Sequence, residues 1–183
     1  MKKLIGGLVC VLLLVTGLPA AATIELEGTI QAEMPAQWTG LVTPSINLTV
    51  DQSVAIAMGS NNSVNETLRI QVEKVVNYER FFLLPRYLFV QVLVLQDSVL
   101  PIDTVIRGRA HKAFVINSPF IGGNNASEEL YIDIPLSYDV PEDTTSEGLY
   151  VHVLAAGILP GGSPEERIFP IAYQRVNLEV TYT

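Results

Sequence analysis

Residues 23–34 read Thr23-Ile24-Glu25-Leu26-Glu27-Gly28-Thr29-Ile30-Gln31-Ala32-Glu33-Met34, and apolar and polar side chains alternate along them without a break. An alternation with period two predicts a β-strand with one buried and one solvated face. The run is also longer than the usual five or six residues of a strand. We therefore expect a long amphipathic strand whose apolar positions are Ile24, Leu26, Ile30 and Met34.

The segment that precedes this strand has the three parts of a secretory signal. Lys2 and Lys3 supply positive charge, residues 4–18 form an apolar core, and Pro19-Ala20-Ala21-Ala22 ends in a small-residue cleavage site. The apolar core is shorter than the roughly 20 residues that span a bilayer. We predict a cleavable signal peptide over residues 1–22, a secreted or cell-surface location, and no membrane span once the signal has been removed.

Composition limits the mature chain further. Cys10, the only cysteine of the chain, lies within the predicted signal, so the mature domain is expected to fold without disulfides. The full chain has a net charge of −8, which makes nucleic acid an unfavourable partner. The remaining length suits one domain. We divide the mature chain into an N-terminal strand and connector at residues 23–40 and a β-domain at residues 41–183.

Short alternating runs continue through that domain. They lie at residues 46–50, 54–58, 68–72, 130–136, 149–153 and 175–182, and Gly, Pro and Asn residues separate them. Residues 87–95 are apolar on almost both faces, which predicts a central strand covered on each side. One helical turn is expected at residues 77–84. Pro135 interrupts an alternating run, which indicates an edge strand or a bulge. The fold class predicted is all-β, an antiparallel β-sandwich of Ig-like or jelly-roll type.

One stretch carries a family resemblance. Residues 132–153 place an alternating strand before the loop Val140-Pro141-Glu142-Asp143, and Gly148-Leu149-Tyr150 begins a second alternating strand. This hairpin resembles the late strand pair of secreted immunoglobulin-like modules in bacterial and archaeal cell-surface proteins. The resemblance implies a β-sandwich that serves as a spacer, adhesin, filament subunit or carbohydrate binder, and fold analogy does not choose among these roles.

The sequence offers little for catalysis. The mature chain has no cysteine, its only histidines are His111 and His152, and it contains no nucleophile-elbow motif. We therefore predict that the protein is not an enzyme and needs no cofactor. Calcium is the one metal considered, because Asp139, Glu142, Asp143 and Glu147 crowd one loop and calcium prefers oxygen ligands.

Two further surface features are notable. Asn47, Asn61, Asn65 and Asn125 each begin an Asn-x-Ser/Thr sequon and are candidate glycosylation sites. Residues 107–112 concentrate positive charge in an acidic chain. They form either a solvated loop or a surface that meets the acidic face of another copy.

The functional hypothesis is a secreted structural or adhesive protein that self-assembles by β-strand addition, as a filament or surface-layer type of subunit. Its expected partners are other copies of itself or another cell-surface protein, and the long N-terminal strand would be donated to a neighbouring subunit. The strand could instead complete its own sheet. The alternative function is a monomeric extracellular module that binds carbohydrate or calcium.

Overall fold

The computed structural model describes residues 23–33, 42–59, 61–74, 86–96, 105–117, 128–158 and 170–183. The described residues form nine strands and no helix. The strands are β1 (Thr23–Glu33), β2 (Thr43–Leu48), β3 (Gln52–Ile56), β4 (Ser63–Lys74), β5 (Arg86–Leu95), β6 (Ile106–Asn117), β7 (Glu128–Asp139), β8 (Ser146–Ile158) and β9 (Ile171–Tyr182). The predicted all-β class is therefore confirmed. No helix suited to crossing a membrane occurs in the described ranges.

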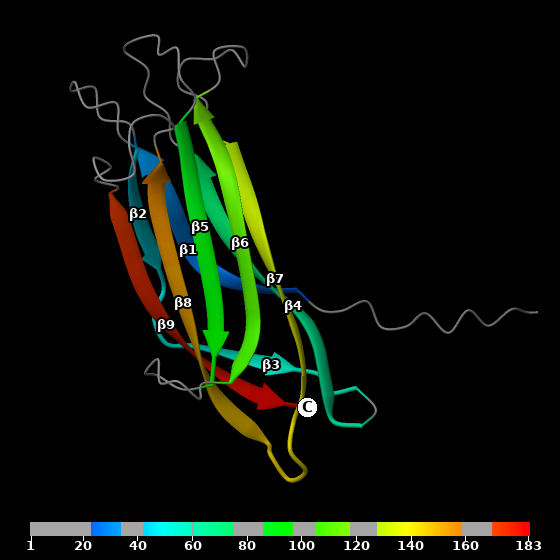
Figure 1. Ribbon diagram of the computed structural model, residues 1–183. Helices are drawn as coiled ribbons and strands as arrows, with labels where there is room; N and C mark the ends of the chain where they lie inside the picture. Colours follow the sequence, from blue (N-terminus) through cyan, green and yellow to red (C-terminus); the bar gives the residue numbers. More distant parts are fainter. Residues whose placement is uncertain are drawn as a thin grey trace, which may run out of the picture.

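All nine strands belong to one sheet, in the order β2-β1-β4-β7-β6-β5-β8-β9-β3. The sheet curls (Figure 1), so that β2, at one end of the order, contacts β8 and β9 near the other end. The expectation of an antiparallel sheet was wrong at two places. Strand β1 runs parallel to β4, and β3 runs parallel to β9, so the sheet is mixed.

The core lies on the inner side of this curled sheet. Alternate residues of each strand point into it, as the period-two patterns require. Strand β9 buries Val176, Leu178, Val180 and Tyr182, while its intervening residues face outward. Strand β5 lies between β6 and β8, as a central strand does. Its buried residues are Leu88, Val90, Val92, Val94 and Leu95, whereas Tyr87, Phe89 and Leu93 are only partly buried and Gln91 is exposed. The expectation that β5 is covered on both faces was therefore wrong.

The predicted hairpin of residues 132–153 was wrong as a pairing, although both of its strands exist. Strand β7 lies between β4 and β6, whereas β8 lies between β5 and β9. Residues 140–145 therefore carry the chain from one part of the curled sheet to another. Asp143 in this segment has a positive φ of 70°, a conformation that Asp adopts more readily than most residues other than glycine.

Several predictions concern residues outside the described ranges. They are the signal peptide at residues 1–22, the connector that begins at Met34, and the helical turn at residues 77–84. Asn125 also lies outside the described residues. These remain predictions.

Candidate assembly site

Strand β1 lies inside the sheet of its own chain. It pairs antiparallel with β2 along residues 28–33 and parallel with β4 along residues 23–26 and 30–31. Three of the four predicted apolar positions, Ile24, Leu26 and Ile30, are buried, and Ala32 is buried beside them. The fourth position, Met34, lies outside the described residues. The space that β1 fills between β2 and β4 is named the β1 slot below.

Gly28 sets the shape of β1. Between Leu26 and Ile30 the register against β4 shifts, because β1 advances by four residues while β4 advances by two. The shift is an even number of residues, so the same face of β1 stays buried on both sides of this bulge. Gly28 has a φ of 121°, and an added Cβ would lie 2.2 Å from the carbonyl oxygen of Asn47. Only glycine fits this conformation and this close approach.

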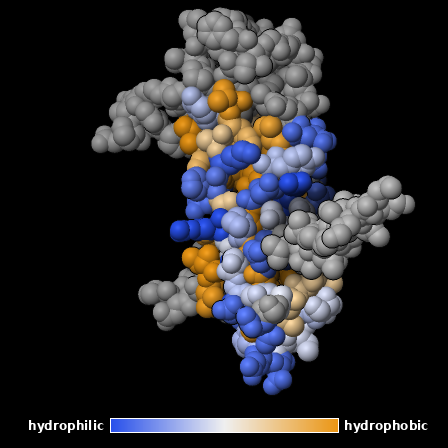
Figure 2. Space-filling view, turned by 90° about the vertical axis from the view of Figure 1, so that its right-hand side faces the viewer, coloured by the Kyte–Doolittle hydropathy of each residue, from blue (hydrophilic) through white to orange (hydrophobic). Residues whose placement is uncertain are grey.

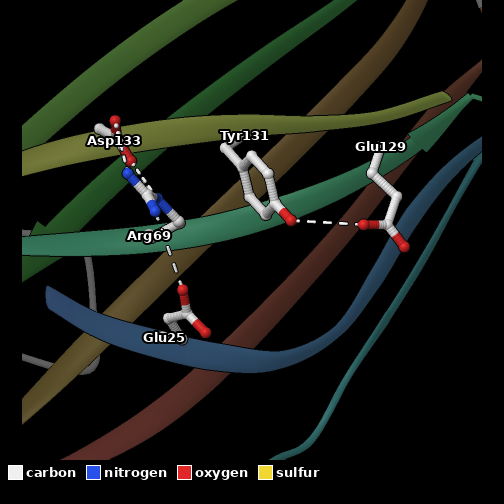
Figure 3. A network of polar contacts seen from close by, with 5 residues as sticks. All are labelled: Glu25, Arg69, Glu129, Tyr131 and Asp133. Carbon is white, nitrogen blue, oxygen red and sulfur yellow. Dashed lines mark hydrogen bonds and ion pairs between the residues drawn. The ribbon is translucent and has the colours of Figure 1, made fainter.

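A polar network crosses the outer side of β1, β4 and β7 (Figure 3). Arg69 Nε donates to Asp133 Oδ1 at 2.7 Å, and Arg69 Nη1 lies 3.9 Å from Glu25 Oε1. The Arg69 guanidinium also lies 5.1 Å from the centre of the Tyr131 ring, and Tyr131 donates to Glu129 at 3.3 Å. The hydrogen bond from Arg69 holds the pKa of Asp133 below its usual value.

This outer network contributes little to holding β1 in place. Its contact with β1 is the long Arg69–Glu25 ion pair, and the Glu25 side chain is largely exposed. Exposed ion pairs of this kind contribute little to stability, because water screens the charges and the side chains lose entropy. One further side-chain contact links the strands, a hydrogen bond of 3.2 Å from Gln31 Nε2 to Glu73 Oε2. The buried apolar face and the backbone pairing therefore hold β1 in its slot.

Strands β6 and β7 are neighbours in the sheet but are hardly paired with each other. The unpaired stretch between them is called the opening below. These neighbours share one register pair, Gly108 with Leu136, although each pairs along its length with the strand on its other side. Pro135 lies beside this pair with its carbonyl oxygen toward Gly108. A proline has no N–H to donate, so it interrupts the ladder there. Strand β7 is thus not a terminal strand, but its pairing fails next to the residue that indicated an edge or a bulge.

Lys112 spans this opening. By alternation it belongs to the inner side of β6, where Gly108 and Phe114 are buried, yet Lys112 is exposed. Its Nζ donates to the carbonyl oxygen of Tyr131 on β7 at 2.9 Å and lies 5.3 Å from the centre of the Phe114 ring. A lysine that lies across an unpaired edge opposes the addition of a foreign strand.

A buried polar cluster lies next to the Gly108–Leu136 pair, where β6 and β7 do meet. Arg107 Nη2 lies 3.2 Å from Glu147 Oε2, and both side chains are about nine-tenths buried. The Arg107 guanidinium lies 4.4 Å from the centre of the Tyr138 ring, whose hydroxyl shares a hydrogen bond of 3.1 Å with that of Tyr182. Burial raises the pKa of both tyrosines. The cluster ties β6, β7, β8 and β9 together, and alternation patterns gave no signal for it.

The four residues considered for calcium do not form a ligand set. Glu147 turns inward to Arg107, while Asp139, Glu142 and Asp143 are exposed on the outside. Within the ranges that the structure describes, no group of three or more acidic, histidine or cysteine side chains is arranged to hold a metal ion.

The basic residues 107–112 lie in strand β6, so the solvated-loop interpretation was wrong. Arg109 and His111 point outward and are exposed, and the His111 ring lies 6.2 Å from that of Phe89 on β5. The other histidine, His152, shares a hydrogen bond of 2.7 Å with the Tyr173 hydroxyl. Burial, with a smaller contribution from Arg175, lowers the pKa of His152.

Three of the four sequons are described, and all three asparagines are exposed. Asn47 lies on β2 and Asn65 on β4, both facing outward, and Asn61 lies in the turn before β4 with a positive φ of 77°. Each side chain is thus accessible, and glycosylation remains a prediction.

Sequence reasoning missed the contact that fixes β2 against β9. Gln174 Nε2 donates to the carbonyl oxygen of Leu48 at 2.7 Å, and the backbone N–H of Leu48 donates to Gln174 Oε1 at 3.0 Å. The side-chain amide of Gln174 therefore makes the two hydrogen bonds with Leu48 that the backbone of a neighbouring strand would make. At the other end of β2, an added Cβ at Gly157 would lie 1.9 Å from the carbonyl oxygen of Val42, which shows how closely β8 approaches the start of β2.

A hollow of about 240 Å³ lies where β3, β8 and β9 meet. Asp51, Tyr150, Asn177 and Glu179 contribute to its lining. On another side of the molecule, where β4 and β7 lie, hydrophilic side chains cover much of the surface and hydrophobic ones form smaller patches (Figure 2).

Comparison of the chain with protein-family models, curated proteins and solved structures finds no match.

Proposed function

We propose that this chain is a secreted, non-enzymatic structural or adhesive protein of the cell surface, and that its copies assemble by exchanging the N-terminal strand β1. The observation that supports this most is the position of β1 in the structure. A strand at the start of the predicted mature chain fills a slot whose two walls, β2 and β4, belong to later parts of the chain. Cleavage after Ala22 leaves β1 joined to the domain through its carboxyl end alone.

The β1 slot is specific for a strand with the alternation of residues 23–33. Ile24, Leu26 and Ile30 each bury an apolar side chain, and burial of that kind contributes roughly 1.5–3 kcal/mol per residue. The bulge at Gly28 and the split register against β4 add a shape that a regular strand does not reproduce. A foreign strand with a different pattern loses both contributions.

Exchange between identical copies preserves these contacts. The β1 of one copy finds in the slot of another the same walls, register and core, so the two arrangements differ mainly in linker strain and in association entropy. Domain swapping of an identical element is for this reason a low-cost route to oligomers. If each copy donates to the next and accepts from the one before, the result is an open chain of subunits, as a filament or surface layer requires.

The test is complementation of a chain that lacks residues 23–33. Its open slot is expected to bind a synthetic peptide of residues 23–34, with a rise in melting temperature and saturation at one peptide per chain. A peptide with Ile30→Asp is expected not to bind, because it would bury a carboxylate in the core. A peptide with Glu27→Lys, altered at an exposed position, is the matched control and is expected to bind. If the unaltered peptide gives no stabilisation, or if all three peptides bind equally, the proposal fails.

The alternative, a monomeric module that binds carbohydrate, has one observation in its favour. The hollow beside Tyr150 combines an aromatic ring with the amide of Asn177 and the carboxylates of Asp51 and Glu179. Such a mixture suits the hydroxyl groups and apolar faces of a sugar. A chain that stays monomeric at all concentrations and binds an oligosaccharide through Tyr150 would favour this function over assembly.

A further inference from the structure

The curled sheet presents two outer faces of different charge. Outward-pointing side chains of β1, β4 and β7 form an acidic face. Its carboxylates include Glu25, Glu27, Glu73, Glu129 and Asp133. Among the outward-pointing side chains that are described on these three strands, Arg69, bound to Asp133, is the one cation. This face is named the acidic face below.

The opposite charge gathers on the outer side of β6, β5, β8 and β9. Register places Arg109, Leu93, His152 and Arg175 in one row across these four strands. The next two rows are His111, Gln91, Leu154 and Tyr173, then Ala113, Phe89, Ala156 and Ile171. None of these twelve positions carries a carboxylate. The three rows are named the basic face.

The basic face also exposes apolar surface. Ile171 and Tyr173 are 63% and 59% exposed, among the most exposed large hydrophobic side chains that the structure describes. The rings of Phe89 and His111 lie 6.2 Å apart on the same face, and Tyr173 covers the buried His152. Exposed aromatic side chains beside arginines are typical of the residues that concentrate binding energy at protein interfaces.

We propose that the basic face of one copy docks on the acidic face of a second copy. A chain with a net charge of −8 repels other copies of itself in general, and complementary faces overcome this in one orientation only. The two faces are different surfaces of the same molecule, so the contact is head-to-tail and propagates into an array unless it closes into a ring. This association uses other surfaces than strand exchange does, and it does not depend on strand exchange.

The test uses the mature chain with β1 locked in its own slot, so that strand exchange cannot contribute. Gln31 and Ser45 are register partners on β1 and β2, and Q31C with S45C supplies the lock in a mature chain that has no other cysteine. Two sets of substitutions then alter the faces. R109E with R175E makes the basic face acidic, and E27K with E73K and E129K makes the acidic face basic.

Sedimentation velocity at low salt decides the outcome. The locked parent is expected to associate, and its association constant is expected to fall at least tenfold between about 20 mM and 500 mM salt, because salt screens exposed charges. Each altered chain alone is expected to stay monomeric where the parent associates, and an equimolar mixture of the two is expected to associate again. A monomeric mixture, a monomeric parent, or altered chains that associate like the parent would overturn the docking. Complementation by the peptide would still stand in each of these cases, because it does not involve the two faces.

Discussion

Gly28 is the residue on which the geometry of β1 depends most directly. It combines a left-handed φ with a backbone contact from Asn47 and Leu48 that leaves no room for a side chain. We expect Gly28→Ala to lower the free energy of unfolding by about 2–4 kcal/mol, through strain and displacement of β1 from β2. Gly148→Ala is the matched control, because an added Cβ there meets nothing within 4 Å. Urea unfolding measures both, and equal effects would contradict the role of Gly28.

Arg107 and Glu147 form a buried ion pair within the polar cluster of β6, β7, β8 and β9. Replacing one partner leaves the other charge buried without compensation, which typically costs about 3–5 kcal/mol. Arg107→Met and Glu147→Gln are therefore each expected to destabilise the domain by about 3 kcal/mol in urea unfolding. The double variant is expected to lose less than the sum of the two, since the second substitution removes the charge that the first one exposed. Additive losses would show that the pair does not act as a unit.

Because of His152, we expect the stability of the domain to decrease at acidic pH. Its pKa in the folded protein is lowered by burial between β5 and β9, where Leu93, Arg175 and the Tyr173 hydroxyl face it. The stability due to neutral His152 is complete above the pKa of an unfolded histidine, about 6.5, and declines as the pH falls below it.

The measurement is thermal unfolding at pH 7.5 and at pH 5.5, for the parent and for His152→Gln. We expect the parent to lose more stability than the variant over this interval, because the variant no longer takes up a proton on unfolding. An equal loss in both would contradict the assignment to His152.

At the scale of elements, alternation predicted most strands because most strands bury one face. The runs in β1, β4, β7, β8 and β9 contain residues such as Ile24, Leu68 and Val176, whose size and spacing make the buried face evident. Strand β6 escaped notice because three successive inner positions, before Phe114, are Gly108, Ala110 and Lys112. Two of these are small and one is charged, so no apolar alternation marks the strand.

Pairing partners were harder to predict than the strands themselves. The parallel pairing of β1 with β4 joins segments about 40 residues apart, and nothing in either sequence states the direction of pairing. The hairpin expected between residues 132 and 153 followed the usual proximity of consecutive strands. The core instead favours placing β7 and β8 in different parts of the sheet. The Gln174 contact with Leu48 depends on the curl of the whole sheet, so local sequence could not reveal it.

The opening between β6 and β7 makes a prediction for Lys112. Lys112→Thr removes the charge that points into this opening and frees the backbone carbonyl of Tyr131. We expect the variant to aggregate faster than the parent through edge-to-edge strand pairing, as seen by light scattering and thioflavin binding. Lys112→Arg, which keeps a positive charge at the same position, is the control and is expected to leave the aggregation rate near that of the parent. A parent-like rate for Lys112→Thr would show that other features protect this edge.

At the scale of the whole molecule, two kinds of contact between copies are compatible in one assembly. Strand exchange uses the inner face of β1, whose apolar side chains enter the core. Face docking uses the outer side of β1 with β4 and β7, and the outer side of β6, β5, β8 and β9. The two contacts share no side-chain surface, so a chain of subunits joined by β1 still presents both charged faces to neighbouring chains.

The measurement that tests strand exchange most directly is cross-linking between two singly substituted chains. One carries Gln31→Cys on β1 and the other carries Ser45→Cys on β2, and the two are refolded together, allowed to assemble and treated with a short bismaleimide. We predict a cross-linked heterodimer, because residues 31 and 45 are register partners and each chain carries only one of the two cysteines. The two cysteines therefore lie opposite each other only when β1 of one copy fills the slot of the other. Thr181→Cys on β9, which pairs with β3 and β8, replaces Ser45→Cys in the control and is expected to give none. No heterodimer from the first pair, in a sample shown to be assembled, would contradict strand exchange.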